Sequence, residues 1–270
     1  MLPSLARLTS PVGYNYTSGR WEFEKLKALL EAGADPDELA GYDGDERTAL
    51  MEAAEEGDVE AVKLLLENGA KIDIQDKEGN TALINALQKG HVEIVELLIE
   101  NGANVNIQDE EGNTMLIRAG KKGQVELVKL LLENGAKVDI KNNENLSALW
   151  LAAWGAHEEI VKLLLSHGAK VGNQDGRNTE LMMAVINQHG PLVKLLLENG
   201  SKVDIRSRNG FTALMWAAKK GLVEIVKLLL SYRAKVDIED NDGKTAIDIA
   251  KTDEIKELLR NAGKSWFGFG

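Results

Sequence analysis

The 270-residue sequence contains no cysteine and only four prolines, and aromatic residues make up 5% of it. The absence of cysteine excludes disulfides, thiolate catalysis and cysteine-ligated zinc. No run of about 18 apolar residues occurs, so no membrane-spanning helix is predicted. Residues 1–19 lack the apolar core of a secretory signal. These absences lead us to expect a cytoplasmic, intracellular protein.

Basic residues are fewer than acidic ones. The chain has 32 Lys and Arg against 43 Asp and Glu, which gives a formal net charge of −11. Nucleic-acid binding normally needs a basic footprint, so this balance argues against nucleic acid as a partner. An acidic surface instead favours solubility and attraction to a basic patch on another protein.

A segment of about 33 residues recurs along the chain. One copy begins at Thr81, and the others begin at Thr48, Thr114, Ser147, Thr179, Thr212 and Thr245. The hydroxyl of each is suited to cap a short inner helix, such as residues 82–89. An outer helix should follow, with an apolar stripe formed by Val92, Val95, Leu97 and Leu98. Residues 103–112 are then expected to form a turn-rich finger.

One such helix pair cannot bury both of its faces, so neighbouring copies must stack. Burial of one leucine per copy should contribute about 2 kcal/mol each. These leucines are Leu50, Leu83, Leu116, Leu149, Leu181 and Leu214. Both ends are atypical: residues 21–33 match an outer helix alone, and residues 245–263 form a shortened unit.

The recurring pattern resembles the ankyrin repeat, whose signature reads G-x-T-P-L-H-x-A-A-x-x-G-H-x-E-x-V-x-L-L-L-x-x-G-A. The copy from Thr81 to Ala103 carries the Thr-x-Leu, Gly-His, Leu-Leu and Gly-Ala elements. The resemblance implies an all-α solenoid of stacked helix-turn-helix units, with finger-like β-turn loops and a concave groove. It implies a domain over residues 19–264, with a partial N-terminal unit, six full repeats and a shortened cap. Residues 1–18 and 265–270 are then tails.

Some positions depart from this pattern. Ala156 and Gln188 replace the glycine between the two helices, and Arg233 replaces the glycine after an outer helix. The last replacement should cost about 1 kcal/mol. The finger before Thr179 is one residue short.

Residue patterns for catalysis are lacking. The histidines, His91, His157, His167 and His189, lie at or beside turn and cap positions and have no zinc-ligand spacing. Gly243-Lys244-Thr245 lacks the first glycine of a phosphate loop. No nucleophile is paired with a base. We therefore expect no enzyme activity, no metal and no cofactor.

The resemblance places binding residues on the exposed side of the inner helices and on the finger tips. These positions are acidic in the first repeat, basic in the third, and apolar or aromatic in the fourth to sixth. The predicted partner-binding residues are Glu52, Glu55, Glu56, Arg118, Lys121, Lys122, Leu146, Leu151, Trp154, Met183, Ile186, Phe211, Trp216, Lys219 and Lys220.

Exposure is expected at Trp154, Met183, Phe211 and Trp216, whereas Trp150, Met182 and Met215 are expected to fill gaps between inner helices. Acidic finger tips (Asp43, Asp45, Glu46, Glu78, Glu110 and Glu111) extend the charge of the first repeats.

We therefore expect a monomeric protein that binds another protein through the groove, as an adaptor, inhibitor, effector or engineered binder. Its partner should carry a basic patch and an apolar anchor. Two alternatives stay open. A small-ligand or oligonucleotide sensor would use aromatic and basic groove residues for stacking and phosphate contacts. A passive structural scaffold would have an evenly polar groove, which the apolar positions oppose.

Overall fold

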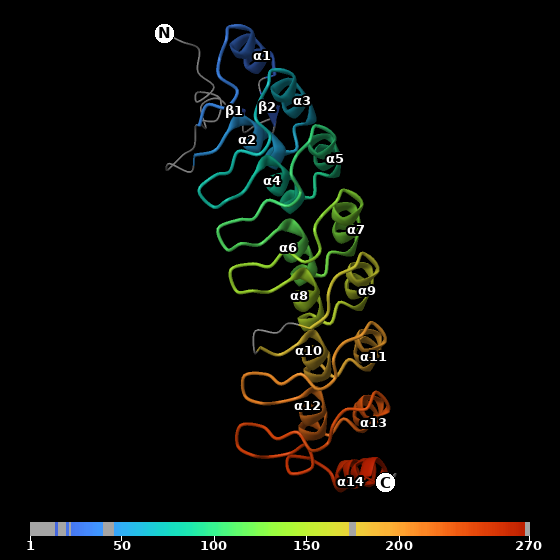
Figure 1. The fold of residues 1–270 in the computed structure, drawn as a ribbon. Helices are drawn as coiled ribbons and strands as arrows, with labels where there is room; N and C mark the ends of the chain where they lie inside the picture. The colour runs from blue at the N-terminus through green and yellow to red at the C-terminus, as the bar shows by residue number, and fades with distance from the viewer. Residues whose placement is uncertain (1–13, 16–19, 22, 40–45, 173–176, 268–270) are drawn as a thin grey trace. The chain divides into compact units, whose positions relative to one another are not determined.

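The computed structural model describes residues 14–15, 20–21, 23–39, 46–172 and 177–267. Helices account for most of its regular structure (Figure 1). The elements are β1 (Tyr14–Asn15), β2 (Arg20–Trp21), α1 (Phe23–Glu31), α2 (Ala49–Glu56), α3 (Val59–Glu67), α4 (Ala82–Lys89), α5 (Val92–Glu100), α6 (Met115–Lys122), α7 (Val125–Glu133), α8 (Ala148–Trp154), α9 (Glu158–Ser166), α10 (Glu180–Ile186), α11 (Gly190–Glu198), α12 (Ala213–Lys220), α13 (Val223–Ser231) and α14 (Asp253–Phe267).

The chain forms two compact units, residues 1–115 and residues 116–270. In the first unit, α2 packs on α3 and on α4, and α4 packs on α5. In the second unit, α10 packs on its partner α11 and lies between α8 and α12 (Figure 1). Each unit is therefore a stack of helix pairs, and the predicted all-α repeat is confirmed.

The inner helices begin at the predicted hydroxyl residues. Thr81 Oγ1 accepts the backbone N–H of Ile84 at 3.4 Å. The same bond is made by Thr48, Ser147, Thr179 and Thr212. Each bond satisfies one of the N–H groups that the first helical turn leaves unpaired. The inner helix predicted over residues 82–89 coincides with α4.

The recurring leucines are all buried, as predicted. The stripe predicted for the outer helix needs one correction, because Val92 is 57% exposed. The buried face of α5 is formed by Ile94, Val95 and Leu98. Val92 begins the helix and lies beside this face rather than within it.

At four places in the described chain an aspartate joins a finger to the following repeat, which the sequence did not lead us to expect. Its Oδ1 accepts a backbone N–H from the next repeat at 2.7 to 3.0 Å. The pairs are Asp37 with Lys71, Asp73 with Asn104, Asp139 with Lys170 and Asp204 with Lys235. The recurrence of aspartate at this position was the signal available in the sequence.

The end units match the predicted pattern in part. At the front, α1 is an outer helix with Leu26 and Leu30 buried. The antiparallel pair of β1 and β2, with Tyr14 opposite Trp21, was not predicted. At the back, residues 246–249 form turns instead of an inner helix. The helix α14 continues to Phe267, past the predicted boundary at residue 264, and residues 268–270 lie outside the described chain.

The predicted glycine replacements occupy left-handed backbone positions. The φ angles are 55° at Ala156, 59° at Gln188 and 62° at Arg233. A side chain at such a position is strained, because its Cβ crowds the backbone. The shortened finger before Thr179 includes residues 173–176, which lie outside the described chain.

Candidate functional site

The fingers are stiffened by their own side chains. In the finger before Thr81, Asp76 Oδ1 accepts the backbone N–H groups of Glu78 at 3.0 Å and Asn80 at 2.8 Å. Asn142 and Asp240 make the same two bonds in later fingers. These turns fix the backbone of the finger, so side chains at its tip project from a defined position.

The acidic residues of the first repeat are largely paired. Arg47 Nε lies 2.8 Å from Glu52 Oε1, and the Arg47 guanidinium also contacts the carboxylate of Glu55. Lys89 Nζ lies 2.9 Å from the other oxygen of Glu55. Glu56 is exposed beside them, whereas Asp43 and Asp45 lie outside the described residues. This pairing leaves less negative charge to attract a basic partner than the sequence indicates.

The ion pairs shift the pKa values of Glu55 and Arg47. Burial alone would raise the pKa of Glu55, but hydrogen bonds from Lys89 and Arg47 outweigh it and hold this pKa below its usual value. Burial alone would lower the pKa of Arg47, yet the charges of Glu52 and Glu55 raise it. Both groups are therefore charged at neutral pH.

A cavity of about 180 Å³, which we call the Arg47 pocket, adjoins this network. It is lined by Arg47, Glu55, Asp76, Lys77, Glu78, Asn80, Asn85 and Gln88. The amide of Asn80 donates to both Asp76 and Glu78. Asn85 is only 6% exposed, and its Nδ2 has no hydrogen-bond partner among the described residues. Most of the polar groups that line this pocket thus bind one another.

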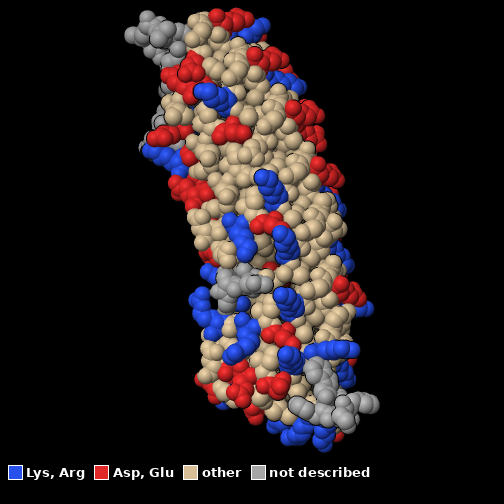
Figure 2. Space-filling view, viewed as in Figure 1, with Lys and Arg blue, Asp and Glu red and all other residues tan. Residues whose placement is uncertain are grey.

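The predicted basic residues lie on α6, in the second unit. Lys121 and Lys122 are exposed at its end, and Arg118 is half-buried. In the second unit, Figure 2 shows Lys and Arg side chains gathered on the side of the inner helices and fingers. This face therefore offers positive charge although the whole chain is acidic.

Side chains on the inner helices and one finger of the second unit make up a set that we call the aromatic patch: Trp154, Ile186, Phe211, Trp216 and Lys219. Trp154 is 48% exposed at the end of α8, and Ile186 is half-buried at the matching position of α10. The rings of Phe211 and Trp216 lie 5.0 Å apart between centroids. Lys219 Nζ covers them at 5.1 and 5.6 Å. The patch thus combines apolar area with one cation.

Five predicted site residues are more buried than expected. Phe211 and Trp216, which were predicted to be exposed, are half-buried. Met183 is 7% exposed, so its predicted exposure is wrong, and Leu146 and Leu151 are also buried. The reason for Met183 is that α8 and α12 pack on both sides of α10. Lys220 is half-buried. Binding by these residues stays a prediction.

The inner-helix residues one position before Leu151, Met183 and Trp216 are Trp150, Met182 and Met215, and they divide into two kinds. Met182 and Met215 are buried, so their predicted role as packing between helices is confirmed. Trp150 is half-buried instead, and its indole N–H donates to the carbonyl oxygen of Asn178 at 2.7 Å. The sequence interpretation missed that this ring forms the wall of a cavity.

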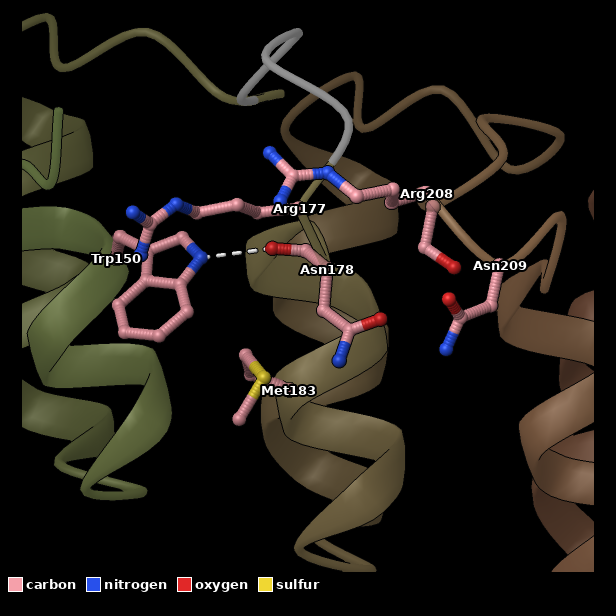
Figure 3. Close-up of a pocket in the computed structure, with 7 residues that line it drawn as sticks. Trp150, Arg177, Asn178, Met183, Arg208 and Asn209 are labelled. Carbon is pink, nitrogen blue, oxygen red and sulfur yellow. Dashed lines mark hydrogen bonds between the residues drawn. The ribbon is translucent and has the colours of Figure 1, made fainter. Parts of the chain in front are cut away.

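This second cavity, the Trp150 pocket, has a volume of about 330 Å³. It is lined by Trp150, Arg177, Asn178, Met183, Ser207, Arg208 and Asn209. Figure 3 shows Arg177 reaching over Trp150 and Arg208 entering from the neighbouring finger, with Met183 below. Arg177 and Arg208 were not predicted, because finger residues vary without a pattern that marks their neighbours.

The histidines have structural contacts, as predicted. His91 Nε2 lies 3.0 Å from the carbonyl oxygen of Glu55, and His157 Nε2 lies 3.4 Å from that of Lys121. His189 Nδ1 caps α11 by accepting the N–H of Leu192. Within the described ranges, no three His, Asp or Glu residues are placed to hold a metal ion. None of the helices described is long and apolar enough to cross a membrane.

Comparison with known proteins assigns the repeat. The family described as ankyrin repeats (3 copies) matches residues 19–109, 104–175 and 181–265, and no catalytic family was found. No curated protein matches the chain. The ankyrin repeat domain of Bcl-3, a member of the IkappaB protein family, is 27% identical with a TM-score of 0.71 and covers 80% of this chain and 99% of its own. The human ASB11 ankyrin repeat domain is 32% identical with a TM-score of 0.63 and covers 80% and 98%.

Proposed function

Because the chain belongs to the ankyrin-repeat family, we propose that it binds a partner protein through the inner-helix and finger side of its second unit. Ankyrin repeats are generally protein–protein interaction modules. We infer that this domain recognises its partner with a preformed surface. Rigid helices and hydrogen-bonded fingers lose little conformational entropy on binding. In this proposal the chain has no catalytic activity of its own.

The observation that carries the proposal is the exposure of Trp154. A tryptophan that is 48% exposed on a short, well-packed helix leaves a large apolar area in water. Exposed aromatic side chains on a fixed scaffold are typical of interfaces, where a few of them carry most of the binding free energy. Its neighbours in the aromatic patch extend the apolar area, and Lys219 supplies a polar rim.

A second candidate function is the binding of a small ligand or oligonucleotide. It is favoured by the exposure of Lys121 and Lys122, together with Trp154 as a stacking surface. The net charge of −11 opposes a polyanionic ligand, so we rank this candidate below protein binding. A passive scaffold is ranked lower still, because it has no use for an exposed tryptophan.

The proposal is tested by the variant Trp154→Ala. A partner is first identified by pull-down from native lysate with mass spectrometry, and its affinity is then measured by titration. Loss of about 2 kcal/mol of binding free energy should weaken the complex about 30-fold. Trp216→Ala should give a loss of the same order, if the fold survives.

The matched control is Tyr232→Ala, which removes an aromatic ring that is 37% exposed and follows the outer helix α13. Circular dichroism checks that each variant is folded. If Trp154→Ala is folded and binds as tightly as the parent while Tyr232→Ala binds weakly, the interface lies on the outer helices and the proposal is wrong.

A further inference from the structure

We propose that the Arg47 pocket binds a carboxamide, carried either by a small free amide or by a glutamine or asparagine side chain of another protein. The described residues that line this pocket all belong to the first unit, residues 1–115. It is therefore a second site, in a different unit from the partner surface proposed above. The observation that carries the inference is the buried amide of Asn85, whose Nδ2 has no hydrogen-bond partner among the described residues.

Asn85 is buried at a cost to stability. Its side chain lies on α4, lines the pocket and is only 6% exposed. Nearly all buried polar groups in folded proteins are paired, because a buried donor without an acceptor has lost its water and gained nothing. The fold does not require an amide here, since the same position, four residues after the capping hydroxyl residue, is Leu151 or Trp216 in later repeats. An acceptor that enters the cavity would remove this cost.

The charged groups of the wall bind one another, which disfavours an ion as the ligand. The carboxylate of Glu55 is shared by Arg47 and Lys89, and Lys77 Nζ lies 3.7 Å from Glu46 Oε1. A ligand that breaks such a pair gains little, because each charge has already exchanged water for a protein partner. A cationic ligand would also meet Arg47, and an anionic one would meet Glu55. A neutral polar ligand meets neither obstacle.

A carboxamide makes both kinds of hydrogen bond that the pocket allows. Its carbonyl oxygen can accept from Asn85, and its NH₂ group can donate to carboxylate oxygens, which keep further lone pairs. Asp76 Oδ2 and Glu78 Oε2 converge on one point of the wall, because both accept from Asn80 Nδ2, at 3.3 and 3.2 Å. The amide of Asn85 can turn about its Cβ–Cγ bond, and a ligand with both a donor and an acceptor satisfies it in either orientation.

The cavity has fixed walls and room for one such group. Asp76 Oδ1 holds the finger through the backbone N–H groups of Glu78 and Asn80, and Gln88 Nε2 donates to Asn80 Oδ1 at 3.5 Å. The volume of about 180 Å³ corresponds to roughly six water molecules at ~30 Å³ each. This is enough for the carboxamide of a glutamine or asparagine side chain with its carbon stem.

The test is a titration of the isotope-labelled full chain, followed by NMR of its side-chain amides. The probes are propionamide, butanone, propionate and propylammonium, which have similar size. The NH₂ signal of Asn85 is identified by its loss in Asn85→Ala. We expect propionamide to shift this signal and to bind about fivefold to tenfold more tightly than butanone, which has the acceptor without the donor. The two ions should bind more weakly than propionamide.

Two variants separate a binding role of Asn85 from a structural one. Asn85→Ala removes the amide, and Asn85→Leu fills its place with an apolar side chain. Both should weaken propionamide binding at least about tenfold. Asn85→Leu should not lower the urea midpoint, because the unpaired amide is no longer buried. The matched control is Asn101→Ala, which removes an exposed amide after the outer helix α5 and should bind like the parent.

The outcomes are distinct. Equal affinities for propionamide and butanone overturn the inference, and so does unchanged propionamide binding in Asn85→Leu. If propionamide does not move the Asn85 signal, water fills the cavity and the inference is wrong. N-acetylglutamine methylamide then distinguishes the sources: binding as tight as that of propionamide assigns the site to a protein side chain, and weaker binding assigns it to a small free amide. None of these results depends on Trp154→Ala, which tests the second unit.

Discussion

The Arg47 pocket and the Trp150 pocket occupy the same place in the repeat but have opposite chemistry. Asp76, Lys77 and Glu78 precede the capping Thr81 by the same spacing with which Ser207, Arg208 and Asn209 precede Thr212. In the Arg47 pocket, carboxylates, cations and amides bind one another. Among the described residues that line the Trp150 pocket are two arginines and a tryptophan, and none of these lining residues is acidic. One fold position thus carries an ion-pair network in one repeat and an arginine-lined cavity in another.

The difference teaches where binding groups are found in a repeat protein. A charge that is paired within its own wall has already exchanged water for a protein partner, so a ligand gains little by replacing that partner. Residue type alone does not separate the two cases, because arginine and asparagine occur in both pockets.

The largest effect on stability is expected from Glu55→Ala, which opens the Arg47 pocket. It removes the carboxylate shared by Arg47 and Lys89 and leaves Arg47 half-buried with one ion-pair partner fewer. We expect a loss of about 2 kcal/mol, between the values typical of exposed and fully buried pairs. Hydrogen exchange of α2 and α4, with urea unfolding, measures it.

The matched control for that variant is Glu93→Ala, at an exposed position of the outer helix α5. It should change stability by less than about 0.5 kcal/mol. The arginine variants of the Trp150 pocket should behave like this control. Equal losses for Glu55→Ala and Arg208→Ala would mean that the two pockets do not differ as described.

The acid sensitivity of the first unit should also distinguish the pockets. The pKa of Glu55 is lowered in the folded chain, so its stabilisation is fully present above the unfolded pKa near ~4.3 and is lost as pH falls through the folded pKa. We expect this contribution to be about 1 kcal/mol after allowance for solvent screening. Glu55→Gln should reduce the loss of hydrogen-exchange protection in α2 and α4 below about pH 4. If hydrogen-exchange protection depends on pH in the same way in the parent and in Glu55→Gln, then Glu55 does not cause the loss of stability in acid.

The helix caps extend the comparison from side chains to backbone. Inner helices of the first unit end in glycine, as at Gly57, whereas α10 is followed by Gln188 at a φ of 59°. Gln188→Gly should therefore stabilise the second unit by about 0.5 to 1 kcal/mol in thermal or urea unfolding. The reverse change, Gly57→Ala, should destabilise more, because its Cβ would lie 2.7 Å from His91 Cε1. A loss of stability in Gln188→Gly would show that its side chain compensates for the strain.

The smallest effect on stability, and the sharpest comparison, is expected from Asn209→Glu. This change places a glutamate at the position that Glu78 occupies in the Arg47 pocket. A carboxylate beside Arg177 and Arg208 should stabilise the second unit by about 0.5 kcal/mol. Asn209→Gln is the isosteric control, and equal stability of Asn209→Glu and Asn209→Gln in urea unfolding would contradict a favourable contact with these arginines.

Much of the fold follows from local patterns that each repeat carries by itself. Thr81, the leucine after Ala82 and Gly102 mark a cap, a buried side chain and a helix end, and all three are found where predicted. The exposure of Trp154 could also be read from its place in the repeat. These features depend on residues a few positions apart, so the sequence alone is sufficient.

What only the tertiary structure decided is which polar groups are already satisfied. Lys89 and Glu55 belong to different repeats, and the carbonyl of Asn178 that holds Trp150 lies 28 residues further along the chain. Met183 is buried because the helices on both sides cover it. The free energy of a charge or a ring depends on its neighbours in space, and these come from segments about 33 residues apart. The sequence by itself therefore determined the repeat, and the packing of fingers from successive repeats decided which of their polar side chains bind one another.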